Sequence, residues 1–383
     1  MPYTHFRYIA YQVPTCAKDK DGNTIFEISP QNKNLKKAAV PDLKGDVKKL
    51  GEDAKARVTR FLAVLKHAHA EVQKIKGDNK NTLKIFMAPE FYFRPTGKSQ
   101  TTGEPAYSYE EYKAIKDVLR KTISEGDTFN NWLVVPGTII WKWTGSTQKR
   151  PNPSQLKAYF NTSLYIKGST GSSTEKASKV LEKAWASPVD GLPTGRHGTT
   201  HTATADKGTS SELYVKYYGQ DKLRKHVFSY GGVRLGLEIC LEHLLHRLFS
   251  NDANNGGLLT ATLPFPGYTD IHLQLLTAGG MPIDKKAIAA RLNGYIMRSD
   301  GMGSKLQTNL CKVTGIIAGN TPAALDPNPD PATNTKCFSD DSRNVERTYA
   351  ISGESSLAIL RPPKYGDKYW FPQKIKVYKR HRV

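Results

Sequence analysis

A cysteine at the end of an apolar, β-prone run is the first residue of this chain that could act as a nucleophile. The run Val233 to Ile239 ends directly before Cys240, and Glu242 to Phe249 has a helix-like pattern. At a strand-to-helix junction, backbone N–H groups can stabilise an oxyanion and the helix start favours a thiolate. A lone buried cysteine is more often an inert core residue. Partners elsewhere in the chain must therefore decide the role of Cys240.

A glutamate at the end of a second apolar strand could serve as the general base. The strand Leu83 to Glu90 closes with a proline and this acid, and the aromatic residues Phe91 to Phe93 follow. A strand-end acid by itself would be a surface residue. Partial burial among aromatic rings, however, raises the pKa of a carboxyl group toward the range that suits proton transfer. We therefore expect Glu90 to act as a base and Tyr92 to line the pocket.

Five motifs follow one another along the chain. They are the opening strand Ile9 to Pro14, the strand end Pro89–Glu90, the segment Pro136 to Thr138, the pair Asn161–Thr162 and the cysteine segment Phe228 to Glu242. Their order, from about Phe6 to Leu276, resembles the nitrilase (carbon–nitrogen hydrolase) superfamily. Each motif alone is loose, and their shared order makes the match specific. The resemblance implies a catalytic glutamate, lysine and cysteine that arrive in this order along the chain.

The resemblance also implies a lysine on a strand that follows the asparagine–threonine motif, with a proline a few residues later. Lys183 has this spacing and is our assignment. Lys179 is the alternative in another register. Lys216, in a strand-like segment closer to the cysteine, is a third candidate.

The implied reaction is hydrolysis of a non-peptide C–N bond through a cysteine thioester, with an amide or carbamoyl substrate preferred over a nitrile. Glu90 would take the proton of Cys240, and the thiolate would attack the acyl carbon. Lys183 and the backbone N–H of Leu241 would stabilise the tetrahedral intermediate. Glu242 stands where the family has an acidic residue two positions after the cysteine. No cofactor and no metal is needed.

Two other functions use the same residues or the same fold. The acyl-enzyme could be captured by an amine, which would make the protein an acyltransferase. A catalytically inactive chain could instead bind nucleic acid or act as a scaffold.

Two histidine pairs offer different chemistry. His197 and His201 are four residues apart, but the Gly-Thr-Thr between them is a poor helix, so the spacing does not favour a zinc pair. His243 and His246 follow Cys240 and could form a Cys–His dyad, although packing and surface roles are the expectation for both.

The composition indicates a basic globular protein. The chain has 383 residues, a net charge of +21, 38% hydrophobic residues and 24% charged residues. The excess of Lys and Arg predicts attraction to something acidic, such as an anionic substrate or, from charge alone, nucleic acid. Four cysteines without disulfide or zinc spacing are typical of a reducing compartment. We see no signal peptide or transmembrane segment and expect a cytoplasmic protein with no membrane contact.

Strands and helices alternate along the chain, which predicts a layered α/β fold with buried sheets. The basic end, Tyr378 to Arg382, is expected to be a solvated terminus. The predicted helices are Glu52 to Ile75 and Tyr109 to Ser124, and the further predicted strands are Phe6 to Val13, Trp132 to Trp141 (a strand pair or one bent strand), Tyr159 to Ile166, Gly257 to Leu263, Ser356 to Leu360 and Ile375 to Tyr378.

The resemblance makes this fold a four-layer α-β-β-α sandwich, and it implies a homo-oligomer that pairs through helical faces. We expect one domain over residues 1–383, because no linker divides the chain. Long loop insertions are expected at about 18–50, 94–107, 191–211 and 326–341.

Overall fold

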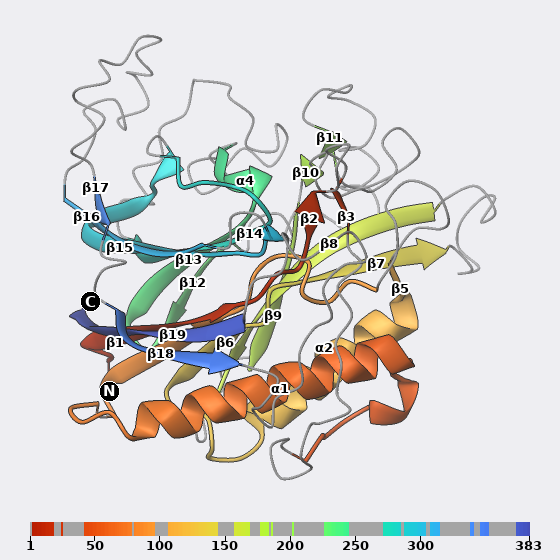
Figure 1. Ribbon diagram of the computed structural model, residues 1–383, viewed down its shortest axis with the longest axis horizontal. Helices are drawn as coiled ribbons and strands as arrows, with labels where there is room; N and C mark the ends of the chain where they lie inside the picture. The colour runs from red at the N-terminus through yellow and green to blue at the C-terminus, as the bar shows by residue number, and fades with distance from the viewer. Residues whose placement is uncertain are drawn as a thin grey trace.

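The chain forms a mixed α/β fold in which two large β-sheets lie face to face and two long helices cover the outer face of one of them (Figure 1). The computed structural model describes residues 2–18, 24–25, 42–78, 80–95, 106–144, 157–168, 177–183, 185–186, 201–202, 226–244, 271–284, 287–303, 307–314, 338–340, 345–351 and 373–383.

The larger sheet has nine strands. They are β1 (His5–Gln12), β4 (Thr82–Met87), β5 (Tyr107–Ser108), β6 (Trp132–Val135), β7 (Thr138–Thr144), β8 (Lys157–Lys167), β9 (Ser178–Glu182), β18 (Val345–Ile351) and β19 (Gln373–Arg382). Their order is β18-β19-β1-β4-β6-β8-β7-β5, and β9 pairs with β8. The central strands β1, β4 and β6 are parallel.

The second sheet has six strands that follow one another in sequence order. They are β12 (Val227–Tyr230), β13 (Val233–Ile239), β14 (Ile271–Ala278), β15 (Ala290–Asp300), β16 (Thr308–Val313) and β17 (Phe338–Asp340). Strands β13, β14 and β15 are parallel. Two short pairs complete the strands, β2 (Ala17–Lys18) with β3 (Thr24–Ile25) and β10 (Trp185–Ala186) with β11 (His201–Thr202).

Two long helices, α1 (Glu52–Gln73) and α2 (Tyr109–Ser124), lie under the nine-stranded sheet (Figure 1). The apolar stripe of α1 is buried, as its spacing predicts. Helix α2 starts with a capping box, in which Ser108 Oγ accepts the Glu111 N–H and the Glu111 carboxylate accepts the Ser108 N–H. Such a cap is worth about 1 kcal/mol. The short helices are η2 (Val47–Lys49) and α4 (Leu241–Leu244).

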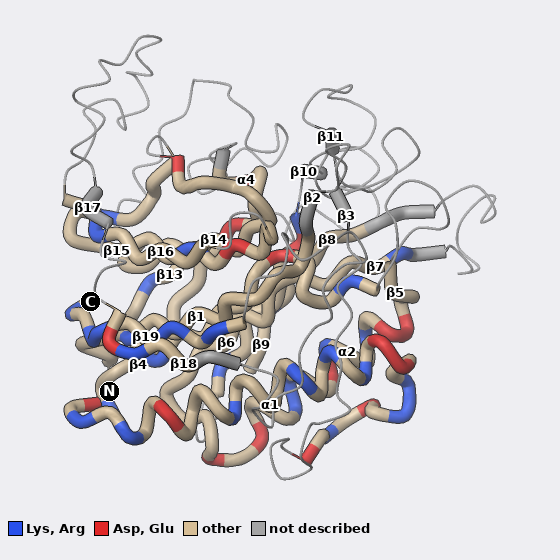
Figure 2. The backbone as a smooth tube through the Cα atoms, viewed as in Figure 1, with Lys and Arg blue, Asp and Glu red and all other residues tan. Residues whose placement is uncertain are grey.

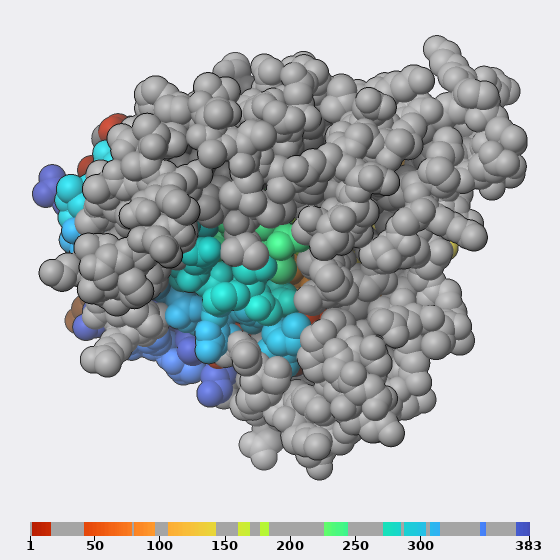
Figure 3. Space-filling model, turned by 90° about the horizontal axis from the view of Figure 1, so that it is seen from above, coloured from red at the N-terminus to blue at the C-terminus, as the bar shows by residue number. Residues whose placement is uncertain are grey.

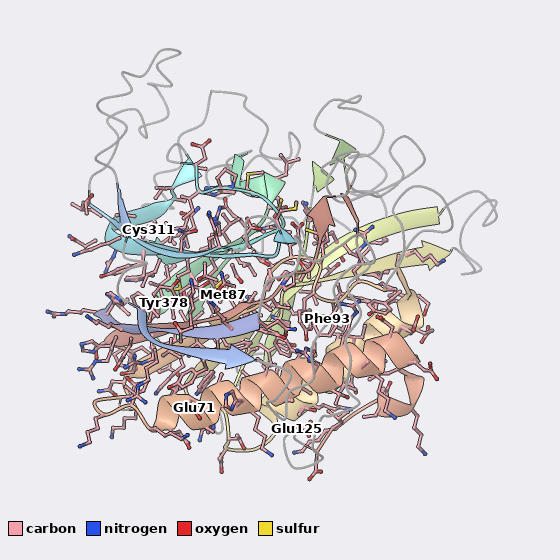
Figure 4. The ribbon with its side chains drawn as sticks, viewed as in Figure 1. Glu71, Met87, Phe93, Glu125, Cys311 and Tyr378 are labelled. Atoms are coloured by element: carbon pink, nitrogen blue, oxygen red, sulfur yellow. The ribbon has the colours of Figure 1, made fainter. Side chains whose placement is uncertain are left out.

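The nine-stranded sheet is buried on both faces. Side chains of β1 alternate, so that Tyr8 enters the core between the two sheets and Tyr11 enters the core between sheet and helices. Met87 and Tyr378 also lie between the sheets, whereas Phe93 lies on the helix side (Figure 4). Successive side chains of a central strand in this sheet are thus directed alternately toward two different cores.

The structure confirms both predicted helices and the strands predicted around β1, β4 and β8. The segment Trp132 to Trp141 forms two strands, β6 and β7, but they do not pair with each other. Both pair antiparallel with β8, which lies between them. The bend between them falls at Gly137, whose φ is 80°.

Two features differ from the sequence interpretation. The basic end is solvated at Lys379, Arg380 and Arg382, but it is also part of a strand, because β19 continues to Arg382 and pairs with β1. Strands β14, β15 and β16 were not predicted at all. Polar residues such as Gln274 and Arg298 interrupt the pattern of these strands in the sequence, but in the fold their side chains are buried and hydrogen-bonded.

Part of the predicted architecture lies outside the described residues. Within the described part, three layers are defined, which are helices, nine-stranded sheet and six-stranded sheet. The predicted fourth layer, a second layer of helices, is not among the described residues. The segments Gly257 to Leu263 and Ser356 to Leu360, most of the four predicted insertions, and the residues His197, Lys216 and His246 also lie outside that part.

Charged residues are spread over several elements. Figure 2 shows Lys and Arg along β19, and both signs of charge along α1 and α2. Among the helices of the described ranges, none is both long and apolar enough to cross a membrane.

Candidate active site

The carboxyl ends of strands from both sheets meet at one place. Thr277, near the end of β14, donates its hydroxyl to the carbonyl of Ala88 just after β4, at 3.2 Å. The carbonyl of the same Thr277 accepts the backbone N–H of Cys240, which follows β13, at 2.9 Å. Glu90 and Cys240 therefore follow strand ends that are joined through a single residue.

Glu90 sits in a buried turn whose backbone is held by neighbouring side chains. Its carbonyl accepts the hydroxyl of Thr15 at 2.5 Å. The next residue, Phe91, has φ of 63°, and its N–H donates to Thr138 Oγ1 at 2.9 Å. A non-glycine residue with positive φ is strained and persists only where its surroundings hold it. The turn thus fixes the direction of the Glu90 carboxylate.

The Glu90 carboxylate forms a fully buried ion pair with Lys183. Lys183 Nζ lies 2.9 Å from Glu90 Oε1, and Asn161 Nδ2 donates to the same oxygen at 2.8 Å. Strand register explains the approach. Strands β8 and β9 are antiparallel with Thr162 opposite Glu182, and the Lys183 N–H donates to the Asn161 carbonyl at 2.8 Å.

The other two candidate lysines have different positions. Lys179 lies in β9, with its Nζ 6.0 Å from the ring centroid of Tyr165. Lys216 lies outside the described residues. Among the three candidates, the structure places Lys183 against Glu90.

Cys240 occupies a strained turn between β13 and α4. Its φ is 49° and it is 2% exposed. The left-handed conformation costs a non-glycine residue about 1–2 kcal/mol. Helix α4 lies beside β10, which starts two residues after Lys183. The turn therefore brings Cys240 to the side of the site where Lys183 enters.

The second carboxylate oxygen of Glu90 is directed toward the end of β14. A Cβ atom placed on Gly279 would lie 3.2 Å from Glu90 Oε2 and 2.6 Å from Phe91 Cε2. Gly279 directly follows the strand that binds the Cys240 N–H, so Glu90 Oε2 faces the end of that strand. Only a residue without a side chain fits there.

The three further predicted site residues have distinct surroundings. The ring of Tyr92 packs in the core between sheet and helices, with its centroid 5.5 Å from that of Phe61. This placement differs from the expected pocket role. Leu241 is buried at the start of α4. Glu242 Oε2 accepts the backbone N–H of Ile239 at 3.1 Å, across the cysteine turn.

Two residues at the site were not proposed from the sequence. Asn161 was noted only as part of a motif, although a buried amide inside an apolar strand is a signal for a bound partner. Phe91 was regarded as one of three similar aromatic residues, and its positive φ could not be foreseen. Among the described residues, no group of three or more His, Cys, Asp or Glu is arranged to hold a metal ion.

Cys16 is a second buried thiol close to Glu90. It packs against Phe91, Ile140 and Met302. Burial raises the pKa of the Cys16 thiol well above its usual value, and the negative charges of Asp300 and Glu90 raise it further. Cys16 is therefore a neutral thiol at physiological pH and does not have the properties of a nucleophile.

We expect iodoacetamide at pH 8 to leave Cys16 unmodified in the folded protein and to modify it after denaturation. The raised pKa keeps the thiol protonated at this pH, and only the thiolate reacts. Peptide mass spectrometry of both samples gives the measurement. Modification of Cys16 in the folded protein as fast as in the denatured chain would contradict the assignment.

Comparisons with known proteins give weak likeness only. No protein-family model matches the chain, and no curated protein matches it. A solved variant of the Nesterenkonia AN1 amidase from the nitrilase superfamily is 11% identical, with a TM-score of 0.34 over 78% of this chain and 76% of that chain. An amidase from Nesterenkonia sp. is 12% identical, with a TM-score of 0.33 over 81% of each chain. Likeness at this level assigns no activity to this chain.

Proposed function

We propose that the protein is a carbon–nitrogen hydrolase that cleaves an amide or carbamoyl C–N bond through a thioester on Cys240. The observation that carries the proposal is the buried Glu90–Lys183 pair, at 2.9 Å, beside the strand end that binds the cysteine turn. A buried charge pair costs desolvation energy that an apolar pair would not, so its presence in a site with a thiol favours a chemical role. The order of the sequence motifs points to the same reaction.

The first half of the reaction forms the acyl-enzyme. Glu90 Oε2 accepts the thiol proton of Cys240, and the sulfur attacks the substrate carbonyl carbon. The Lys183 ammonium and the Leu241 N–H stabilise the oxyanion, since the first N–H groups of a helix have no partner within the helix. The C–N bond then breaks as Glu90 returns the proton to the leaving nitrogen.

The second half releases the acid. Glu90 accepts a proton from water, and the hydroxide attacks the thioester carbon. The C–S bond breaks and the thiolate of Cys240 takes the proton back. Asn161 and Lys183, which both donate to Glu90 Oε1, hold the carboxylate in one orientation through both halves.

We further propose that a helical layer covers the outer face of the six-stranded sheet, which would complete a four-layer sandwich, and that subunits associate as a homo-oligomer. The net charge of +21 supports an anionic small-molecule substrate, which the field of the protein would attract.

The test is intact-mass spectrometry of protein that is quenched rapidly after mixing with a panel of small amides and carbamoyl compounds. We expect a mass increase equal to the acyl group, located on the peptide with Cys240, and no increase in Cys240→Ala. Cys311→Ala is the matched control, because Cys311 is buried in β16 and should leave the adduct intact. Release of amine by Cys240→Ala at the wild-type rate would refute the proposal, and appearance of an acylated amine in place of the acid would identify an acyltransferase.

A further inference from the structure

Two side-chain hydrogen bonds span the cysteine turn, one inside the other. The inner bond joins Ile239 N–H to Glu242 Oε2 at 3.1 Å. The outer bond joins His243 Nδ1 to Glu238 Oε2 at 2.8 Å. Both bonds connect a residue before Cys240 with a residue after it, so they oppose any opening of the turn.

The hydrogen bonds of His243 determine its tautomer. The backbone N–H of Asp284 donates to His243 Nε2 at 3.0 Å, so this nitrogen carries no proton. In the neutral ring the proton is therefore on Nδ1, which donates it to Glu238 Oε2. Both ring nitrogens are engaged, and His243 is oriented as a bridge and not as a base for the thiol of Cys240.

Gln274 of β14 completes a fully buried network. Its Nε2 donates to Glu238 Oε2 and to the Ala287 carbonyl, both at 2.9 Å. Its Oε1 accepts the N–H groups of Ala289 at 2.7 Å and Ala290 at 3.2 Å. Glu238, His243 and Gln274 are each 0% exposed. Such networks fix one arrangement of the elements they join.

The network joins the cysteine turn to the segment between β14 and β15. Leu237, next to Glu238, enters the core between the sheets, so the Glu238 side chain leaves the opposite, outer face of β13. In the view from above, the green atoms of residues near 240 adjoin the cyan atoms of the 271–303 region (Figure 3). The network thus lies behind Cys240, on the far side from the sheet that carries Glu90.

The backbone of the turn is held by main-chain bonds as well. The His243 N–H donates to the Cys240 carbonyl at 2.9 Å, and the Cys240 N–H donates to Thr277. These bonds fix the two peptide groups of Cys240 but do not tie the turn to residues 284–290. The His243 and Gln274 side chains make that connection.

We propose that His243 is a positioning residue, which holds Cys240 in its strained conformation by bridging the Glu238 carboxylate and the backbone at Asp284. The inference rests on the proposed function of Cys240. A nucleophile must be placed within a fraction of an ångström, and supporting hydrogen bonds provide this placement. Glu238, His243 and Gln274 are fully buried and act on the position of the sulfur, so we expect them to affect the chemical step more than substrate affinity.

Three variants separate the two bonds of the imidazole. His243→Asn keeps a donor at the Nδ1 position for Glu238, His243→Gln keeps an acceptor near the Nε2 position for Asp284, and His243→Ala removes both. We expect kcat to fall about 100-fold in His243→Ala and about 10-fold in the two amide variants, with KM within about twofold of wild type. His69→Asn is the control, because His69 lies on α1 against Phe129 and Trp132.

A second readout does not need a substrate. The rate of Cys240 alkylation by iodoacetamide is measured by peptide mass spectrometry. It should differ most from the wild-type rate in His243→Ala, less in His243→Gln and His243→Asn, and not at all in His69→Asn. If wild type turns over amides and the folded His243 variants keep both kcat and the alkylation rate, the inference is refuted. If no protein shows turnover but alkylation still depends on His243, the proposed function fails and the positioning role stands.

Discussion

Lys183→Met should lower the free energy of unfolding by about 3–5 kcal/mol, because it leaves the Glu90 carboxylate buried without its charge partner. Turnover should fall by at least about 1,000-fold, since in the proposed mechanism the same ammonium stabilises the oxyanion. Denaturant titration and steady-state kinetics give the two quantities. Lys179→Met is the matched control, four residues earlier in strand β9, and it should change both quantities little, because Lys179 is half-buried and lies over Tyr165.

The double variant Glu90→Gln with Lys183→Met separates stability from chemistry. It removes both charges, and Asn161 can still hydrogen-bond to the new amide oxygen. Most of the lost stability should therefore return, because a neutral pair has no uncompensated charge. Activity should stay absent. Recovery of turnover in the double variant would show that neither residue takes part in the reaction.

Gly137→Ala should destabilise the protein by about 3 kcal/mol or more, through strain and overpacking together. Gly137 has φ of 80°, and an added Cβ would lie 2.1 Å from the carbonyl oxygen of Pro89. That oxygen belongs to the backbone directly before Glu90, so it cannot move without moving the carboxylate. Folded protein recovered at low temperature should also have lower kcat.

Gly126→Ala controls for the backbone conformation alone. Gly126 has φ of 116°, but no atom lies within 4 Å of the added Cβ. Its cost should be limited to the left-handed strain, about 1–2 kcal/mol, with kcat unchanged. Thermal unfolding of both variants compares them. Equal midpoints for Gly126→Ala and Gly137→Ala would mean that contact with Pro89 has no effect on stability.

The sequence was sufficient to locate the strand ends at Glu90 and Cys240, because both follow long apolar runs that no helix pattern matches. It also located Lys183 in the register that the structure places against Glu90. Long, regular apolar segments are set by local pattern, and the parallel strands of a sheet bring their carboxyl ends to one edge.

The remaining parts depend on partners that are distant in sequence. Gln274 has the composition of a loop residue, yet it is buried in β14 because Glu238 and the 287–290 backbone satisfy its amide. The basic residues of β19 also depend on a partner that is distant in sequence, since pairing with β1 determines their extended conformation. Tyr92 was misplaced because the positive φ of Phe91 directs the following side chain to the other face of the sheet.

The strand ends before Glu90 and Cys240 are joined by hydrogen bonds between the two sheets, through Thr277 to Ala88 and to Cys240. The strands that hold Glu90, Asn161, Lys183 and Cys240 run from β4 to β14 and span residues 82–278. Contacts between segments so far apart in sequence form late and slowly during folding. If the proposed function is correct, a newly made chain has no reactive centre until both sheets have formed and packed, and the onset of activity then reports that step of folding.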